Sequence, residues 1–210
     1  SILILTRGSH ELANCHIPGI SLSFSLALIH QLRDDPITIV VQNSTFAGLD
    51  ITTSDGSLSN IAVVVEDTSF ATFTLPPNIP VRNASVTFTR VTTPDQSSVT
   101  SPPALPAPPP LPTTSAVPLP ATPVEAPHNH AAFFAMNNIT ANNFSLVVNN
   151  CTCNAINSRL RGNYSVFLFE RTIIEGASSI VVRNLQLNVS STENTQVFAF
   201  TNHSVLDGVR

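Results

Sequence analysis

The chain has 210 residues and a net charge of −4, and charged residues make up only 10% of it. About a quarter of the residues in an ordinary globular protein are charged, so Ser, Thr and Asn must provide most of the polar surface here. The nine basic residues, all Arg, form no basic patch, which argues against a nucleic-acid partner. No apolar run reaches the roughly 18–20 residues of a membrane span.

The first residues indicate a piece of a longer protein. The chain does not begin with Met, and Ser1–Thr6 is too short for the apolar region of a signal peptide with its flanks. Any targeting or anchoring signal would then lie outside this segment. Further on, Leu12–Ile17 fits a diverged copy of the repeat described below, and Pro18-Gly19 is typical of a turn. Ile20–Leu28 alternates apolar and polar residues, as a half-buried strand does.

Two segments repeat closely: Ile37–Gly48 (ITIVVQNSTFAG) and Ile61–Thr72 (IAVVVEDTSFAT), which begin 24 residues apart. A fixed period of this length is typical of stacked-repeat proteins, and the apolar, β-branched content makes the unit a strand. The connecting Leu49–Asn60 contains Asp55-Gly56, a turn signal. One period therefore holds two strands and turns. This content predicts one coil of a parallel β-helix, with equivalent residues about 4.8 Å apart along the stack.

A Pro-rich segment interrupts this pattern. After the strand expected at Val81–Val91, twelve of the seventeen prolines lie between Pro94 and Pro127. Proline cannot donate a backbone hydrogen bond to a sheet, so we expect an extended, disordered insertion over 94–127. Its PxxP spacings, such as Pro106–Pro109, also permit a different interpretation, an intracellular Pro-rich interaction scaffold.

The strand pattern resumes after the insertion, where Phe144–Ala155 aligns with the repeat. Three later copies are expected at Leu168–Ile174, at Val181–Leu187 as a second face of a coil, and at Ala199–Val205. The sequence therefore predicts an all-β fold, a right-handed parallel β-helix (solenoid) segment. Its coils would occupy residues 1–93 and continue in the same domain over 128–210.

The clearest chemical signal is the glycosylation sequon, Asn-x-Ser/Thr. The chain has eight sequons, against about four expected by chance from its composition. They begin at Asn43, Asn83, Asn138, Asn143, Asn150, Asn163, Asn188 and Asn202. We expect several of them to carry N-glycans on a secreted or surface protein. The alternative is that Asn, Ser and Thr serve the strand corners, where Asn side chains can pair along the stack.

The acidic residues form no catalytic set that the sequence makes visible. Carbohydrate-cleaving enzymes use paired carboxylates. The residues considered for such a role are Asp50, Asp55, Glu66, Asp67, Glu170, Arg171 and Glu175. Glu66-Asp67 aligns with Gln42-Asn43, and also with the pairs at 149–150, 170–171 and 183–184, so it indicates a turn position with changing polar occupants. We predict no catalytic residue; a polysaccharide lyase or glycoside hydrolase on the same fold is the alternative.

Cysteine and histidine indicate no metal site. Cys15, Cys151 and Cys153 are odd in number, so they cannot all pair within one chain, and a bridge from Cys15 to one of the other two stays open. A zinc site joining His128 and His130 to Cys151 and Cys153 lacks the usual spacing between cysteine ligands. The sequence contains no glycine-rich phosphate loop. We expect neither a metal nor a cofactor.

The motifs VVQNSTF, VVEDTSF and VVNNCTC, with NNIT and NVSS, resemble the dispersed-gene-family surface glycoproteins of kinetoplastids, which carry repetitive strand motifs of this type. More broadly, the chain is similar to the pectin-lyase-like β-helix proteins. The resemblance implies an extracellular or cell-surface, membrane-associated protein whose anchor lies outside this segment. It also implies an adhesion-like role toward host or extracellular glycans and proteins, with no catalytic residues. We therefore expect a non-enzymatic structural or adhesive module.

Overall fold

The chain folds into parallel β-sheets. The computed structural model describes residues 2–5, 8–26, 36–54, 56–94, 131–156, 163–190 and 194–209. Within these ranges the fold is all-β, without a helix, and the strand pairs are parallel. The all-β class predicted from the period-two pattern is therefore confirmed.

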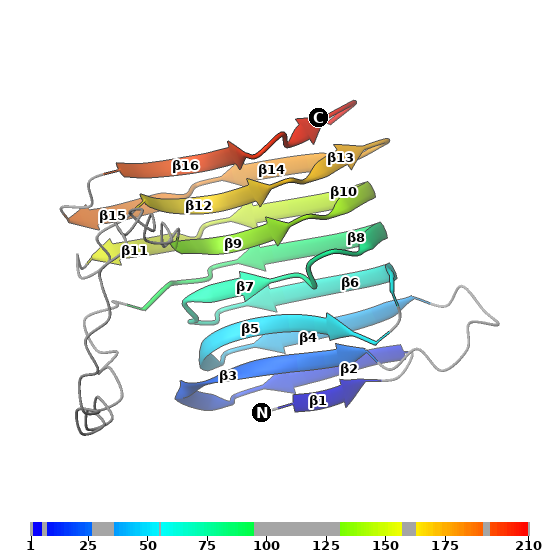
Figure 1. The fold of residues 1–210 in the computed structure, drawn as a ribbon. Helices are drawn as coiled ribbons and strands as arrows, with labels where there is room; N and C mark the ends of the chain where they lie inside the picture. Colours follow the sequence, from blue (N-terminus) through cyan, green and yellow to red (C-terminus); the bar gives the residue numbers. More distant parts are fainter. Residues whose placement is uncertain are drawn as a thin grey trace, which may run out of the picture.

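Two large sheets divide the strands between them. The seven-stranded sheet contains, in order, β1 (Ile2–Leu5), β3 (His16–Leu26), β5 (Thr45–Thr53), β7 (Thr72–Thr74), β9 (Ala131–Asn137), β12 (Asn163–Glu170) and β16 (Asn194–Thr201). The eight-stranded sheet contains β2 (Gly8–Ala13), β4 (Ile37–Gln42), β6 (Leu58–Glu66), β8 (Pro80–Thr89), β10 (Thr140–Asn149), β13 (Ile173–Glu175), β14 (Ser179–Arg183) and β17 (Val205–Leu206). β11 (Thr152–Ile156) pairs with β15 (Gln186–Ser190) separately. Most consecutive strands alternate between the sheets, and each sheet follows the order of the chain (Figure 1).

The two copies of the repeat lie side by side in register. Ile37 of β4 pairs with Ile61 of β6, and the pairing continues residue by residue to Gln42 and Glu66. Alternate side chains point inward, so Val41 and Val65 are fully buried. This pairing confirms the predicted stacking of the two segments. The register is well specified, because a one-residue shift would expose the whole apolar set.

The core lies between the two sheets and is rich in phenylalanine. Phe73 of β7 stacks on Phe134 of β9 with ring centroids 5.6 Å apart. Phe88 of β8 meets Phe73 edge to face at 5.2 Å from the opposite sheet. Burial of each such side chain contributes roughly 1.5–3 kcal/mol to folding, so these rings tie the two sheets together.

Strands before and after the Pro-rich stretch share both sheets. β8 pairs with β10, and β7 pairs with β9. Apart from Pro94, the residues of the predicted insertion at 94–127 lie outside the described ranges. The strands that flank the stretch therefore belong to the same stack.

Two assignments made from the sequence are wrong. β3 runs through Pro18-Gly19, where the structure has a register irregularity between Ile17 and Ser21 rather than a turn. Val181 pairs with Val147, so it continues the face of the repeat, whereas Leu168 of β12 and Ala199 of β16, the starts of two other expected copies, lie in the opposite sheet. The two faces are both apolar and alternating, and the sequence pattern could not distinguish them.

Candidate functional site

Residues with positive φ mark the corner that follows each long strand of the eight-stranded sheet. These residues are Asn14, Asn43, Asp67, Arg90, Asn150 and Asn184, with φ between 44° and 57°. We call them the first corner column. Asn and Asp tolerate this left-handed conformation better than other side chains, which explains most of its composition.

Side chains of this column bond to one another along the stack. Asn43 Nδ2 donates to Asn14 Oδ1 at 2.6 Å, and Asn184 Nδ2 donates to Asn150 Oδ1 at 2.9 Å. In both bonds the later residue donates to the earlier one. In the middle of the column, Arg90 forms two hydrogen bonds to Asp67, at 2.6 and 2.8 Å. Those bonds, together with the charge of Arg90, lower the pKa of the Asp67 carboxyl.

Two further columns have the same character. The second corner column, Asn78, Asn138, Arg171 and Asn202, precedes strands of the eight-stranded sheet, and the third, Asn60, Asn83 and Asn143, bends β6, β8 and β10. Glu170-Arg171 therefore does not align with Gln42-Asn43, as the sequence suggested, but lies at the other edge of the stack. Sequence reasoning also missed Arg90 as a member of the first column, because arginine carries no signal for positive φ.

The columns explain why sequons are frequent. Six of the eight sequon asparagines have positive φ and are exposed: Asn43, Asn83, Asn138, Asn143, Asn150 and Asn202. In five of them the next residue is buried and the one after it is an outward-facing Ser or Thr, which begins a strand in three cases and lies within β8 or β10 in the other two. Asn188 lies in β15 and donates to Asn154 Oδ1 at 2.8 Å. Asn163 begins β12, and its side chain lies outside the description.

Asn150 differs from the other sequon asparagines whose side chains are described. Nδ2 of Asn43, Asn83, Asn138, Asn143, Asn188 and Asn202 donates to a neighbouring layer. Before Asn150 the column holds Arg90, which has no side-chain acceptor. Among the described residues, no hydrogen bond uses Asn150 Nδ2, although its Oδ1 accepts from Asn184.

A polar groove lies on the outer side of β8, β10 and β13. It has a volume of about 410 Å³ and is lined by Pro80, Arg82, Asn83, Thr140, Asn142, Asn143 and Glu175. Asn142 Nδ2 donates to Glu175 Oε1 at 3.5 Å. Arg82 is exposed and has no hydrogen bond or ion pair with any described residue. The groove thus offers a guanidinium, amides, a hydroxyl and a carboxylate to a polar ligand.

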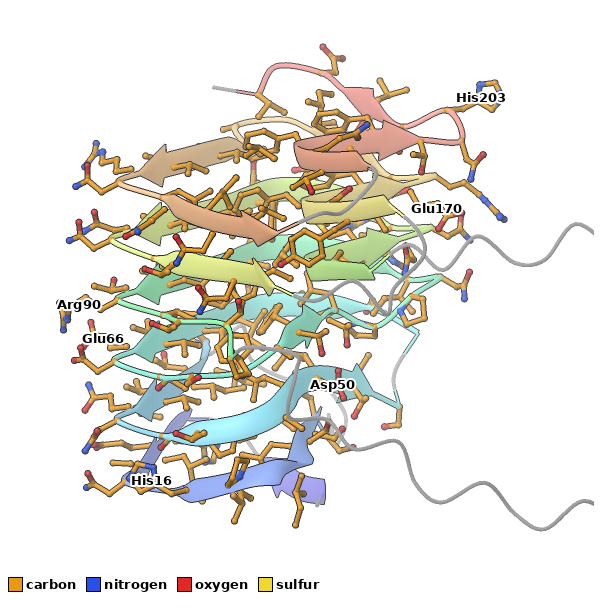
Figure 2. All side chains as sticks on the ribbon, turned by 90° about the vertical axis from the view of Figure 1, so that its left-hand side faces the viewer. His16, Asp50, Glu66, Arg90, Glu170 and His203 are labelled. Atoms are coloured by element: carbon orange, nitrogen blue, oxygen red, sulfur yellow. The ribbon has the colours of Figure 1, made fainter. Side chains whose placement is uncertain are left out.

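The other acidic candidates are spread over the stack. Glu66 lies at one edge beside Arg90, and Glu170 lies at the opposite edge (Figure 2). Asp50 accepts a hydrogen bond of 2.5 Å from Thr74. Asp55 lies outside the described residues. Of the described candidates, Glu175 alone lines the groove.

The cysteines are free thiols. Cys151 and Cys153 are buried, and loss of solvent raises the pKa of both, that of Cys153 to about 12. Cys15 follows Asn14 at the start of the first corner column, and Cys151 follows Asn150 four layers later, a separation of about 19 Å that excludes a bridge between them. His128 and His130 lie outside the described residues. Where the chain is described, no three His, Cys, Asp or Glu side chains are grouped to hold a metal.

Comparisons of the chain with protein-family models, with curated proteins and with solved structures find no match. In the described ranges, no helix has the length and apolar character needed to cross a membrane. Function must therefore be inferred from the corner columns and the groove.

Proposed function

We propose that the chain is a segment of a right-handed parallel β-helix that serves as a non-enzymatic structural or adhesive module of a secreted or cell-surface glycoprotein. The architecture is supported by strands that alternate between two parallel sheets. It is supported further by columns of equivalent residues that continue from layer to layer, as expected for stacked repeats.

The glycoprotein part rests on one observation, the exposure of sequon asparagines at the corners. A glycan at a corner extends into solvent and displaces no strand. Among the sequon asparagines whose side chains the structure describes, Asn150 is the one whose Nδ2 donates no hydrogen bond to a described residue. We therefore propose Asn150 as the first sequon to be used.

Secretion from eukaryotic cells tests this proposal. We would add a signal peptide, map glycans by mass spectrometry, and compare Thr152→Ala, which removes the Asn150 sequon, with Thr152→Ser, which keeps it. The expected result is a folded, secreted chain with a glycan at Asn150 in the wild type and Thr152→Ser. Retention of the glycosylated chain inside the cell, with secretion only when glycosylation is inhibited, would contradict the proposal.

We assign ligand binding in an adhesive module to the groove. Hydroxyl groups of an oligosaccharide can bond to the amides of Asn142 and Asn143 and to the unpartnered guanidinium of Arg82. The test is calorimetric titration with neutral and acidic oligosaccharides. Arg82→Ala should weaken binding about tenfold or more. Arg183→Ala should not, because Arg183 pairs with Asn149 at the other end of β10. Binding that is equal in both variants would place the ligand elsewhere.

The enzyme alternative is less well supported by the groove. Glycoside hydrolysis uses two carboxyl groups about 5–9.5 Å apart, and Glu175 is the one carboxylate among the described lining residues. Release of new reducing ends from an oligosaccharide, lost in Glu175→Gln, would favour the enzyme over the binding module.

A further inference from the structure

The groove carries opposite charges at its two ends. Arg82 of β8, Asn142 of β10 and Glu175 of β13 are paired in register, so they form one outward column across neighbouring strands of the eight-stranded sheet (Figure 1). Neighbouring strands lie about 4.8 Å apart, which places the backbone of Arg82 about 10 Å from that of Glu175. A ligand that lies along this column meets a guanidinium first, then an amide and then a carboxylate.

Arg82 is the charge that is free to bind a ligand. Its side chain is exposed, and no hydrogen bond or ion pair joins it to another described residue. Arg171, at the corner before β13, is instead paired with Glu170 at 3.7 Å. A guanidinium forms two parallel hydrogen bonds to a carboxylate, and a neutral sugar has no such group. The Arg82 end of the groove therefore favours an acidic group.

The Glu175 end of the groove disfavours a second acidic group. A carboxylate accepts hydrogen bonds from hydroxyl groups and repels another anion. The separation of about 10 Å is close to the screening length at physiological ionic strength. An anion held at Arg82 is therefore little affected by Glu175, whereas an anion beside Glu175 is repelled at close range. The unit of a ligand that lies here should be neutral and should carry hydroxyl groups.

Gly176 keeps this end of the groove open. It follows Glu175 as Asn143 follows Asn142, and its φ is 72°. A Cβ atom on Gly176 would lie 3.1–3.2 Å from side-chain amide atoms of Asn142 and Asn143, which is closer than ordinary van der Waals contact. A larger residue would displace both amides. Glycine therefore leaves them in place to form hydrogen bonds with a neutral sugar.

We propose that the groove binds an oligosaccharide in which an acidic unit lies next to a neutral one. This inference rests on the ligand-binding role proposed for the groove. The carboxylate of the acidic unit pairs with Arg82, and the hydroxyl groups of the neutral unit bond to Asn142 and Glu175. A chain with an anionic group on every unit binds less well, because it places a second negative charge beside Glu175.

Calorimetric titration with oligosaccharides of equal length tests the proposal. The probes are a hyaluronan tetrasaccharide, in which carboxylates occur on alternate units, neutral chitotetraose, and a heparin tetrasaccharide, which is anionic on every unit. The full chain is made in bacteria, without N-glycans, because Asn83 and Asn143 line the groove and begin sequons. The hyaluronan fragment should bind about tenfold or more tightly than chitotetraose, and more tightly than the heparin fragment. About 1 M salt should reduce its advantage over chitotetraose.

Variants assign the preference to the two charges. Arg82→Gln should remove the advantage of the hyaluronan fragment over chitotetraose, and it should leave chitotetraose binding nearly unchanged because glutamine keeps a hydrogen-bond donor. Glu175→Gln should raise the affinity for the heparin fragment. Arg183→Gln is the matched control and should change neither preference, since Arg183 pairs with Asn149 at the other end of β10.

The outcomes separate this inference from the function on which it rests. Equal binding of the hyaluronan fragment and chitotetraose, or tighter binding of the heparin fragment by the wild type, would overturn the preference for an acidic unit beside a neutral one. The groove would then still be a carbohydrate site. A preference for the hyaluronan fragment that survives in Arg82→Gln would place the acidic group elsewhere and overturn the inference as well. Binding of none of the probes would overturn the inference together with the proposed ligand-binding role.

Discussion

Asn138 donates a hydrogen bond of 2.7 Å to Asn78, which lies 60 residues earlier in the chain. The bond joins adjacent layers of the second corner column on either side of the Pro-rich stretch. The adjacent layers that hold the two copies of the repeat are 24 residues apart, as at Gln42 and Glu66. The difference of 36 equals the number of residues from 95 to 130.

Removal of residues 95–130 is therefore predicted to leave the fold intact. The deletion joins Pro94 to Ala131 and gives β10 the 24-residue offset from β8 that β6 has from β4. Shortening a connection also lowers the entropy cost of closing it, so the unfolding midpoint should stay the same or rise slightly. Circular dichroism and urea unfolding measure this, with a Gly/Ser replacement of equal length as control. Loss of cooperative unfolding in the deletion variant alone would show that the segment is part of the core.

Asn43 provides a test of the corner geometry. Its φ is 44°, a conformation that costs an ordinary L-residue about 1–2 kcal/mol. Asn43→Ala should lower the free energy of unfolding by about 1–3 kcal/mol, because strain is added to loss of the bond to Asn14. Asn43→Gly loses the same bond without the strain and should be less destabilised. Equal losses in urea titrations of the two variants would argue against a left-handed corner.

The thiols should differ in reactivity. Cys153 is buried with a pKa of about 12, and burial also raises the pKa of Cys151. Little thiolate forms at either residue near neutral pH, and thiolate is the reactive form. Cys15 is partly exposed. Iodoacetamide should modify Cys15 alone in the native protein and all three thiols in urea, as read by peptide mass spectrometry. Rapid native alkylation of Cys153 would contradict its burial.

The Asp67–Arg90 pair predicts a small dependence of stability on pH. The folded-state pKa of Asp67 is lowered below its ordinary value of 3.8. Its stabilising effect is therefore full above that value and is lost as pH falls through the lower, folded-state pKa. Asp67→Asn keeps a residue suited to positive φ, so wild type and variant should differ near pH 7 and converge in acid. Because both side chains are exposed, about 1 M salt should also remove the difference. If the difference in stability between wild type and Asp67→Asn persisted in acid, it would have to arise from something other than charge.

Much of the layer structure could be predicted from the repeat. Segments 37–48 and 61–72 stack in register because their alternating apolar residues leave one burial pattern available. Phe144–Ala155 joins the same column for the same reason. The position of Leu168–Ile174 could not be predicted, because both sheets bury alternating apolar residues. The local pattern therefore does not show to which sheet a strand belongs.

The site residues were predictable only in part. The sequon asparagines stand out by composition, yet their shared role at corners depends on φ values that the sequence does not state. Arg90 was missed because its place in the first corner column depends on hydrogen bonds to Asp67 in the adjacent layer, which the sequence does not show. The groove was missed as well, because Arg82, Asn142 and Glu175 come from three strands that only the stacking brings together.

Distances between spin labels along one outward column test the stacking most directly. Register pairing places Ser9, Thr38, Ser145 and Ser179 in one column, with five layer steps from Ser9 to Ser179. In a cysteine-free background diluted with unlabelled protein, double electron–electron resonance should give about 24 Å for 9 and 179. Pairs 38/179 and 9/145 each span four steps and should both give about 19 Å. Equal values for those two pairs, one step shorter than the first, are the predicted result. Unequal values, or no regular decrease with layer number, would contradict a single stack of parallel layers.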